Sequence, residues 1–275
     1  MRIGLRASSI LIAVASAATP LLAHADPVVI LAAGSLRGVV SDLAAAGNAV
    51  GIEVRSVFGG SGLLRGRIEK GEKADLFLSA DLGHPRKLQA SGRTVLPVVL
   101  FARNRMCVVA RRAGGVTEKN LVDRLLADGV RVKTSTPIAD PSGDYAWTIL
   151  DRIEAARPGA GAKLKEKAQA NMTLTAPAAA PGQSAAAALF AANLIDVWIT
   201  YCSASAGVEK EIPGLASIEV PPALDPHPMN GLAVLSDRPE VLRLAVLLLS
   251  EEGQAIVGRN GLVPVGATDP LSSPP

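Results

Sequence analysis

Aromatic residues are scarce in this chain of 275 residues, at 3% of the composition. Positive charge is limited as well, because 28 Lys and Arg are set against 25 Asp and Glu, a formal net charge of +3. Nucleic-acid-binding surfaces need clustered Lys and Arg, commonly with aromatic side chains on which bases stack. The sequence contains no such stripe, and we therefore expect no nucleic acid partner.

Long apolar runs are also lacking beyond the first 25 residues, where no segment would span a bilayer without charges or proline. Residues 1–25 combine a short basic start, the apolar stretch 10–14, and small residues at Ala23 and Ala25. This pattern is typical of a secretory signal peptide, although a buried core helix is the alternative. We expect cleavage before Asp26 and a periplasmic protein. Removing the two arginines of this segment lowers the net charge from +3 to +1.

Cysteine is limited to Cys107 and Cys202, and both lie in apolar, strand-like runs. Disulfides form readily in exported proteins, so a pair of cysteines in such a protein favours a bond between them. Two buried free thiols are the alternative, since free cysteine is among the most buried residue types.

Catalytic constellations are absent from the sequence. Only His84 and His227 would remain after signal cleavage, and no G-x-S-x-G elbow supplies a hydrolase nucleophile. The glycines at 60 and 62 do not start a dinucleotide motif, because Arg65 stands where the third glycine belongs. No His, Cys and carboxylate cluster suits a catalytic zinc ion. We therefore predict that the protein is not an enzyme and carries no cofactor or metal.

Strand-like runs and helical patterns alternate along the chain, which is typical of βαβ units. We expect strands over residues 28–33, 52–58, 74–79, 131–135, 172–175, 197–202 and 231–236, with 95–110 forming two extended pieces. We expect helices over residues 36–46, 62–69, 82–89, 140–155, 184–192, 239–250 and 252–258.

These two series predict an α/β fold of two lobes, each a mainly parallel sheet flanked by helices. The first lobe would comprise residues 26–101 and 225–275, and the second residues 102–224. Two extended segments, near residues 100 and 225, would connect them. A cleft between lobes is the usual place for a small ligand, and we expect the binding site there.

Two serines stand where a predicted strand gives way to a helix. Ser35 follows the first strand, and Ser61 follows Gly59 and Gly60 after the second. Helix N-termini offer free N–H groups and a partial positive charge, so such turns bind anions. Each serine is also a common helix cap, and one serine alone favours that simpler role. Two of them at the carboxyl ends of neighbouring parallel strands favour an anion pocket.

Five stretches carry a resemblance to a known family: "AAGSL" (32–36), "GGSGLLRGRIEKGEKADLFLSAD" (59–81), "ADPSGDYAW" (139–147), "ITYCS" (199–203) and "SEEGQAIVGRNGLVPV" (250–265). Through them nearly the whole mature chain resembles the periplasmic molybdate-binding proteins of ABC transporters, which have the type II periplasmic binding-protein fold. The resemblance implies a substrate-binding protein that captures molybdate or tungstate and delivers it to a membrane permease. We expect a monomer.

The resemblance also implies a set of ligand-binding residues. Ser35 and Ser61 match the serines that hold the oxyanion, and Tyr201 matches a tyrosine at a strand end. The backbone donor before a second-lobe helix falls at Gln183 or Ser184. In this fold the strand that enters the second lobe runs beside the strand ending in Tyr201, an arrangement that would bring the two cysteines together.

The chain departs from the family pattern after Asp140, where the loop is shorter and Asp144 stands nearby. Molybdate, tungstate and sulfate carry no proton at neutral pH, so a facing carboxylate would repel them, by about 4 kcal/mol at 4 Å in an effective dielectric near 20. A phosphate species has a proton to donate, and ferric iron would use Asp144 with Tyr145 and Tyr201. Another small organic anion is a further alternative, and so is a plain capping role for Asp144.

Overall fold

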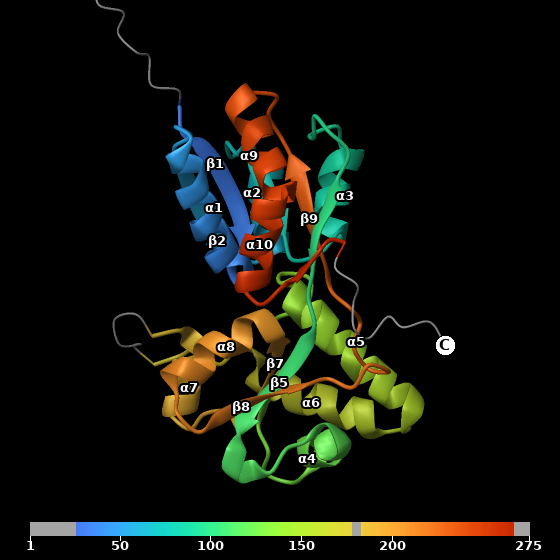
Figure 1. Cartoon of the computed structure of the whole chain (residues 1–275). Helices are drawn as coiled ribbons and strands as arrows, with labels where there is room; N and C mark the ends of the chain where they lie inside the picture. Colours follow the sequence, from blue (N-terminus) through green and yellow to red (C-terminus); the bar gives the residue numbers. More distant parts are fainter. Residues whose placement is uncertain (1–25, 178–182, 267–275) are drawn as a thin grey trace, which may run out of the picture.

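The computed structural model describes residues 26–177 and 183–266, and the expected signal peptide lies outside them. Two sheets, each covered by helices, form the two lobes of the molecule (Figure 1). The first sheet has six strands in the order β10-β4-β9-β3-β1-β2, and the second has four in the order β6-β7-β5-β8. The predicted two-lobed α/β fold is therefore confirmed.

The first sheet and its helices use both ends of the described chain. Its elements are β1 Val28–Ala33, α1 Arg37–Ala49, β2 Val54–Gly59, α2 Ser61–Glu69, β3 Leu76–Ser79, α3 Gly83–Ala90, β4 Val99–Arg103, β9 Met229–Val234, α9 Pro239–Leu249, α10 Glu251–Arg259 and β10 Val263–Pro264. A short 3-10 helix, Gly34–Leu36, connects β1 to α1. All six residues of β1 are buried, because helices cover both faces of the sheet at its centre.

The second sheet is built from the middle of the chain. Its elements are β5 Met106–Arg111, α4 Leu121–Leu126, β6 Val132–Lys133, α5 Pro141–Ala156, α6 Ala160–Met172, α7 Ala185–Ala191, β7 Val197–Tyr201, α8 Cys202–Glu211 and β8 Leu215–Glu219, with 3-10 helices at Arg112–Gly114 and Glu118–Asn120. The chain enters this sheet between β4 and β5, and it leaves between β8 and β9.

The expectation of mainly parallel sheets is wrong. In the first sheet β1 pairs in parallel with β2 and β3, whereas the β3–β9, β4–β9 and β4–β10 pairs are antiparallel. In the second sheet only the β6–β7 pair is parallel. The difference arises where the chain crosses between lobes, because strands that enter a sheet directly, without a crossover helix, pair antiparallel.

The strand expected over residues 172–175 is also wrong. Helix α6 runs as far as Met172, and residues 174–177 have no regular structure. The segment before it, rich in alanine and lysine, forms a helix that the strand assignment overlooked, since alanine and lysine both favour helices.

The predicted disulfide is confirmed, with Cys107 and Cys202 bonded and their Cα atoms 4.9 Å apart. Cys107 lies on β5, opposite Thr200 of β7, and Cys202 is the first residue of α8. The bond therefore ties the strand that enters the second lobe to the turn that follows Tyr201.

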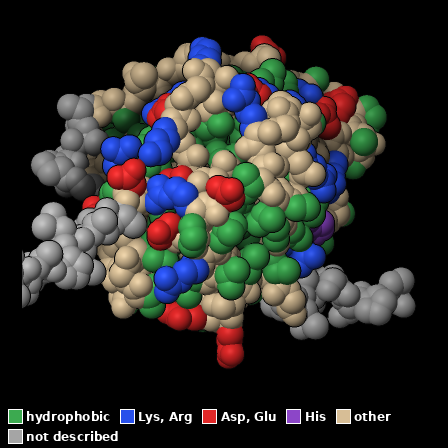
Figure 2. All heavy atoms as spheres, turned by 90° about the horizontal axis from the view of Figure 1, so that it is seen from above, with side chains coloured by type: hydrophobic (Ala, Val, Ile, Leu, Met, Phe, Trp, Pro, Cys, Tyr) green, Lys and Arg blue, Asp and Glu red, His purple; other side chains and the backbone are tan. Residues whose placement is uncertain are grey.

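Positive and negative side chains alternate over the face of the first lobe seen from above, with apolar side chains between them (Figure 2). Within the described ranges, none of the helices has the length and apolar character needed to cross a bilayer.

Candidate functional site

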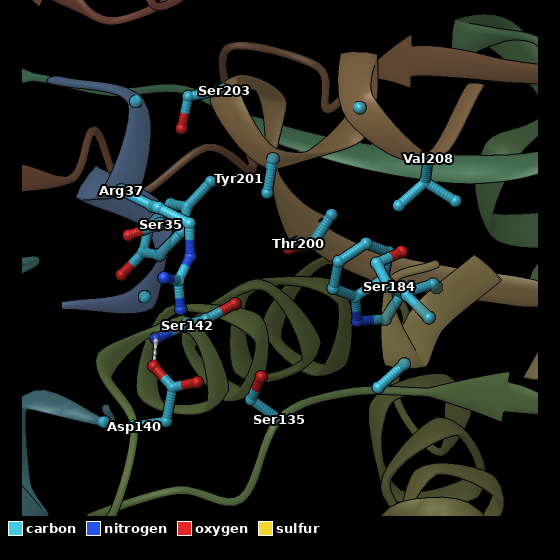
Figure 3. Close-up of a pocket in the computed structure, with 18 of the residues that line it drawn as sticks. Ser35, Arg37, Ser135, Asp140, Ser142, Ser184, Thr200, Tyr201, Ser203 and Val208 are labelled. Carbon is cyan, nitrogen blue, oxygen red and sulfur yellow. Dashed lines mark hydrogen bonds between the residues drawn. The ribbon is translucent and has the colours of Figure 1, made fainter. Parts of the chain in front are cut away.

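A cavity of about 660 Å³ lies between the two lobes, and residues of both lobes line it. Ser35 comes from the 3-10 helix after β1, Arg37 from the start of α1, and Ser142 from the first turn of α5 (Figure 3). Thr200, Tyr201 and Ser203 come from the end of β7 and the start of α8. Hydroxyl groups therefore dominate the polar lining, as a site that donates hydrogen bonds to an anion requires.

Ser35 lies at the cavity wall, as the sequence predicts. It sits in the 3-10 helix that follows β1, and its side chain is half-buried. Neither this turn nor α1 has a side-chain cap, so Ser35 does not act as a helix cap in the structure. Its hydroxyl lies at the cavity wall, where it can donate a hydrogen bond to a ligand oxygen.

Ser61 occupies a different position from the one expected. Its side chain is fully buried at the start of α2, and its Oγ accepts a hydrogen bond of 3.1 Å from the backbone N–H of Ala80. The residues at the wall here are its neighbours Gly59 and Gly60. The structure thus brings the turn to the cavity but holds the Ser61 side chain behind it, and a ligand contact by Ser61 stays a prediction.

Tyr201 lines the cavity from the end of β7. Its phenol donates a hydrogen bond of 3.3 Å to the carbonyl oxygen of Ala80, which lies in the opposite lobe. Burial raises the pKa of Tyr201 well above its ordinary value, since a buried phenolate would lose its hydration. The phenol therefore stays protonated at neutral pH and serves as a hydrogen-bond donor.

Ser184 lines the cavity as the N-cap of α7. Its Oγ accepts from the backbone N–H of Ala187 at 3.2 Å, and its own N–H donates to the Glu211 carboxylate at 2.7 Å. Gln183 directly precedes this cap. The backbone donor assigned to Ser184 by resemblance is thus already bonded to a carboxylate, and the assignment to Gln183 or Ser184 stays a prediction.

Asp144 does not face the cavity. Its carboxylate accepts a hydrogen bond of 2.7 Å from the backbone N–H of Ile138, in the shortened loop before α5. The carboxylate at the cavity wall is that of Asp140, which is also the N-cap of α5 and accepts from the N–H of Ser142 at 3.1 Å. Burial raises the pKa of Asp140 above its ordinary value. The acidic group at the cavity wall is therefore Asp140, and a ligand contact by Asp144 stays a prediction.

Two donors at the wall escaped the sequence analysis. The Arg37 guanidinium lies over the Phe58 ring, 4.1 Å from its centre, and the Arg37 side chain borders the cavity. Ser142 is 4% exposed, and its Oγ is buried without a hydrogen-bond partner. A cation in the first turn of a helix opposes the helix dipole, so the position of Arg37 was the signal that could have identified it.

The two lobes touch beside this cavity through backbone atoms. A Cβ atom placed on Gly60 would lie 2.4 Å from the carbonyl oxygen of Ala139, and one on Gly62 would lie 2.3 Å from that of Ile138. Both distances are shorter than any side chain tolerates, and glycine is therefore required for this approach. The site is consequently enclosed by contact between the lobes on this side.

A cation site built on the tyrosines receives little support from the geometry. The rings of Tyr145 and Tyr201 meet edge to face, with centroids 6.1 Å apart, and burial raises the pKa of Tyr145 to about 12. The Tyr145 oxygen accepts from the N–H of Met229 at 3.4 Å. Across residues 26–177 and 183–266, no group of three or more His, Cys, Asp or Glu side chains is arranged to hold a metal ion.

Solved structures of similar fold include the sulfate-binding protein SubI of Mycobacterium tuberculosis H37Rv, with a TM-score of 0.72 and 17% identity over 88% of each chain. The periplasmic molybdate-binding protein of Azotobacter vinelandii aligns with a TM-score of 0.68 and 20% identity, over 86% of this chain and 98% of that one. At these identities the likeness concerns the fold.

A relative closer in sequence is the protein PM1146 of Pasteurella multocida (strain Pm70), which is 40% identical over 158 residues. That alignment covers 55% of this chain and 64% of the relative's length. Residues 28–263 match the family described as bacterial extracellular solute-binding protein. Because the match spans both sheets and the cavity between them, this chain belongs to the bacterial extracellular solute-binding protein family.

Proposed function

We propose that this protein captures a tetrahedral oxyanion in the cavity between its lobes and delivers it to the membrane permease of an ABC transporter. The observation that carries the proposal is the convergence of donors from both lobes, with Ser35 and Arg37 on one side and Ser142 on the other. The protein acts as a periplasmic monomer and performs no chemistry on its ligand.

Molybdate, or tungstate of nearly the same size and charge, is the first candidate ligand. The sequence motifs resemble those of molybdate-binding proteins, and one protein of the same fold is a molybdate-binding protein. An unprotonated oxyanion accepts hydrogen bonds and donates none, so it suits the hydroxyls of Ser35 and Ser142 and the guanidinium of Arg37. Hydrogen bonds to a charged ligand are worth about 1.5–3 kcal/mol each.

The second candidate is an oxyanion that retains a proton or carries a hydroxyl group, such as phosphate. The Asp140 carboxylate at the cavity wall favours this candidate, because it can accept a hydrogen bond from the ligand. A fully deprotonated oxyanion at the same place would be repelled by Asp140 unless that carboxyl group took up a proton.

Thermal unfolding with a panel of ligands tests the proposal. The purified mature protein is mixed with molybdate, tungstate, sulfate, phosphate or ferric iron, and the melting temperature is compared with that of the protein alone. A ligand at 100 times its dissociation constant adds about 2.7 kcal/mol of stability. We expect at least one oxyanion to raise the melting temperature, and no rise with any of them would contradict the proposal.

The substitution Asp140→Asn separates the two candidates by the sign of its effect. Asparagine is also a good N-cap, so the start of α5 keeps its capping group. Removing the charge should tighten the binding of molybdate and weaken that of a ligand that donates to Asp140. Asp144→Asn is the matched control, because that carboxylate bonds the Ile138 N–H away from the cavity.

A further inference from the structure

A second cavity of about 540 Å³, which we call the annex, adjoins the cavity between the lobes. The two share several wall residues, namely Gly60, Ser135, Asp140, Ala185, Ala186 and Trp198. Because these residues border both spaces, a ligand seated among Ser35, Arg37 and Ser142 lies next to the annex. It lies between the loop that precedes α5 and the N-terminal half of α7.

The annex is mainly apolar. Leu63, Leu174, Leu189 and Ile195 line it together with the indole of Trp198. Among the described residues at its wall, the cation is Lys133, whose ammonium group donates to the backbone carbonyls of Asn171 at 2.9 Å and of Met172. The annex thus suits an uncharged, apolar group, and the charged part of a ligand belongs beside Arg37.

One polar group in the annex is buried and has no partner. Thr134 is fully buried on the wall, and its Oγ1 makes no hydrogen bond. Ser142 presents the same situation in the first cavity. Leaving a buried hydroxyl unpaired costs about 1–3 kcal/mol, so Ser142 is a candidate to bind the charged head of a ligand and Thr134 to bind a neutral polar atom, such as an ester oxygen, at the edge of the annex.

The size of the combined space does not result from widely separated lobes. The backbone at Gly60 and Gly62 already touches the carbonyl oxygens of Ala139 and Ile138, and the Tyr201 phenol already bonds Ala80 across the cleft. Further closure on this side would force these atoms together. The annex therefore persists when the lobes are in contact.

We infer that the ligand is an organic monoester of an oxyanion, specifically a phosphate monoester with a compact apolar substituent. Pockets of about 300–1,000 Å³ are typical for organic ligands, and the annex alone lies within that range. The oxyanion head would lie among Ser35, Arg37 and Ser142, and the substituent would fill the annex. This inference rests on the proposed capture of an oxyanion and narrows its second candidate.

Asp140 lines both spaces. Its carboxylate is the reason to expect a phosphate head group rather than a fully deprotonated oxyanion. A phosphate monoester loses its second proton near pH 6, so a fraction of it still has a proton to donate near neutral pH. The Asp140 carboxylate would accept that proton in a hydrogen bond while Arg37 balances the remaining charge. The geometry thus favours a head group that both donates and accepts.

Calorimetric titration with matched probes tests this inference. Phenyl phosphate is the organic probe, and inorganic phosphate and molybdate are the bare anions. Each is titrated into the mature protein and into the variants Leu174→Ala, which removes apolar wall, and Ala176→Phe, which fills the annex. Leu249→Ala is the control, because Leu249 is an exposed leucine on α9, away from both spaces.

We expect phenyl phosphate to bind at least about tenfold more tightly than inorganic phosphate, since burial of the ring adds apolar contact. Both annex variants should remove most of this preference while leaving the affinity for bare anions unchanged, and Leu249→Ala should do neither. Equal affinity for the ester and the bare anions, or equal effects of the annex variants on both, would overturn the inference and leave oxyanion capture intact. Failure of all three probes, with no rise in melting temperature with tungstate or sulfate, would instead refute the capture of an oxyanion.

Discussion

Tyr201 and Ala80 join the two lobes, because the phenol at the end of β7 donates a hydrogen bond of 3.3 Å to the Ala80 carbonyl oxygen after β3. The N–H of the same Ala80 donates to Ser61 Oγ at 3.1 Å. Two residues that the sequence identified as ligand contacts thus meet at a single residue of the first lobe. The hydrogen bonds that hold the lobes together beside the cavity therefore use groups for which ligand contacts are predicted.

Replacing Tyr201 with phenylalanine removes the donor but preserves the ring, which packs in the core. We expect affinity for the anion to fall by roughly threefold to tenfold, because the lost bond to Ala80 joins the two lobes around the cavity and an ordinary hydrogen bond contributes about 0.5–1.5 kcal/mol. Calorimetric titration measures the change. Tyr145→Phe is the control, since the Tyr145 hydroxyl only accepts a long bond from Met229, and a loss of equal size there would refute a special role for Tyr201.

Gly62 sets how closely the lobes approach. In Gly62→Ala the new methyl group would overlap the Ile138 carbonyl oxygen, and the cleft must open to relieve the clash. We expect weaker anion binding and a larger radius of gyration with saturating ligand, measured by small-angle scattering.

Gly66→Ala provides the comparison for this variant. It lies in the same helix, gains the same helix propensity, and has open space around its Cβ position. If the two variants scatter and bind alike, contact at Gly62 does not limit closure.

The disulfide should contribute strongly to stability. It closes a loop with a sequence separation of 95 residues. A disulfide that closes a loop of about 100 residues stabilises the folded protein by up to about 4.7 kcal/mol, because it lowers the entropy of the unfolded chain. We expect Cys107→Ser with Cys202→Ser to lower the free energy of unfolding by about 2–5 kcal/mol in denaturant titrations. A change below about 1 kcal/mol would show that the unfolded chain gains little freedom.

The sequence identified most of the elements and some of the residues that line the cavity, for physical reasons that differ between residues. Ser35 was identified because a serine between a buried strand and a helix is a local pattern, and the strand β1 ends where its apolar run ends. The disulfide was predictable because exported proteins form disulfides readily and because the fold places the strand entering the second lobe beside the strand that ends in Tyr201. Ser61 fits the same pattern, but its side chain points into the lobe. There its hydroxyl accepts a hydrogen bond from the Ala80 N–H, which would otherwise have no partner.

Asp140 and Asp144 show what a sequence alone does not resolve. They are one helical turn apart, and their side chains diverge because Asp144 bonds the Ile138 N–H while Asp140 caps the helix at the cavity. The direction of β9 and the antiparallel pairs depends on where the chain crosses between lobes, which no local pattern encodes.

The raised pKa of Asp140 has a defined effect on stability. Its pKa is higher in the folded protein than in the unfolded chain, so the folded state binds more protons between the two values. The wild-type protein should therefore lose stability as pH rises through that window. Asp140→Asn lacks this loss and should be more stable than wild type at neutral pH but equally stable well below the ordinary pKa of aspartate. Denaturant titrations of both proteins across pH measure the difference, and a gap that does not change with pH would contradict the assignment.

Hydroxyl groups at the cavity wall bind the oxyanion in the proposed function, and calorimetric titration of wild type and Ser35→Ala tests this role most directly. Molybdate, phosphate and phenyl phosphate serve as probes, and melting curves of both proteins accompany the titrations. We predict that at least one probe binds wild type with one site per chain. Ser35→Ala should weaken that binding roughly tenfold to a hundredfold without lowering the melting temperature, because Ser35 caps no helix. Absence of binding by all three anions, or unchanged affinity in Ser35→Ala, would contradict the account.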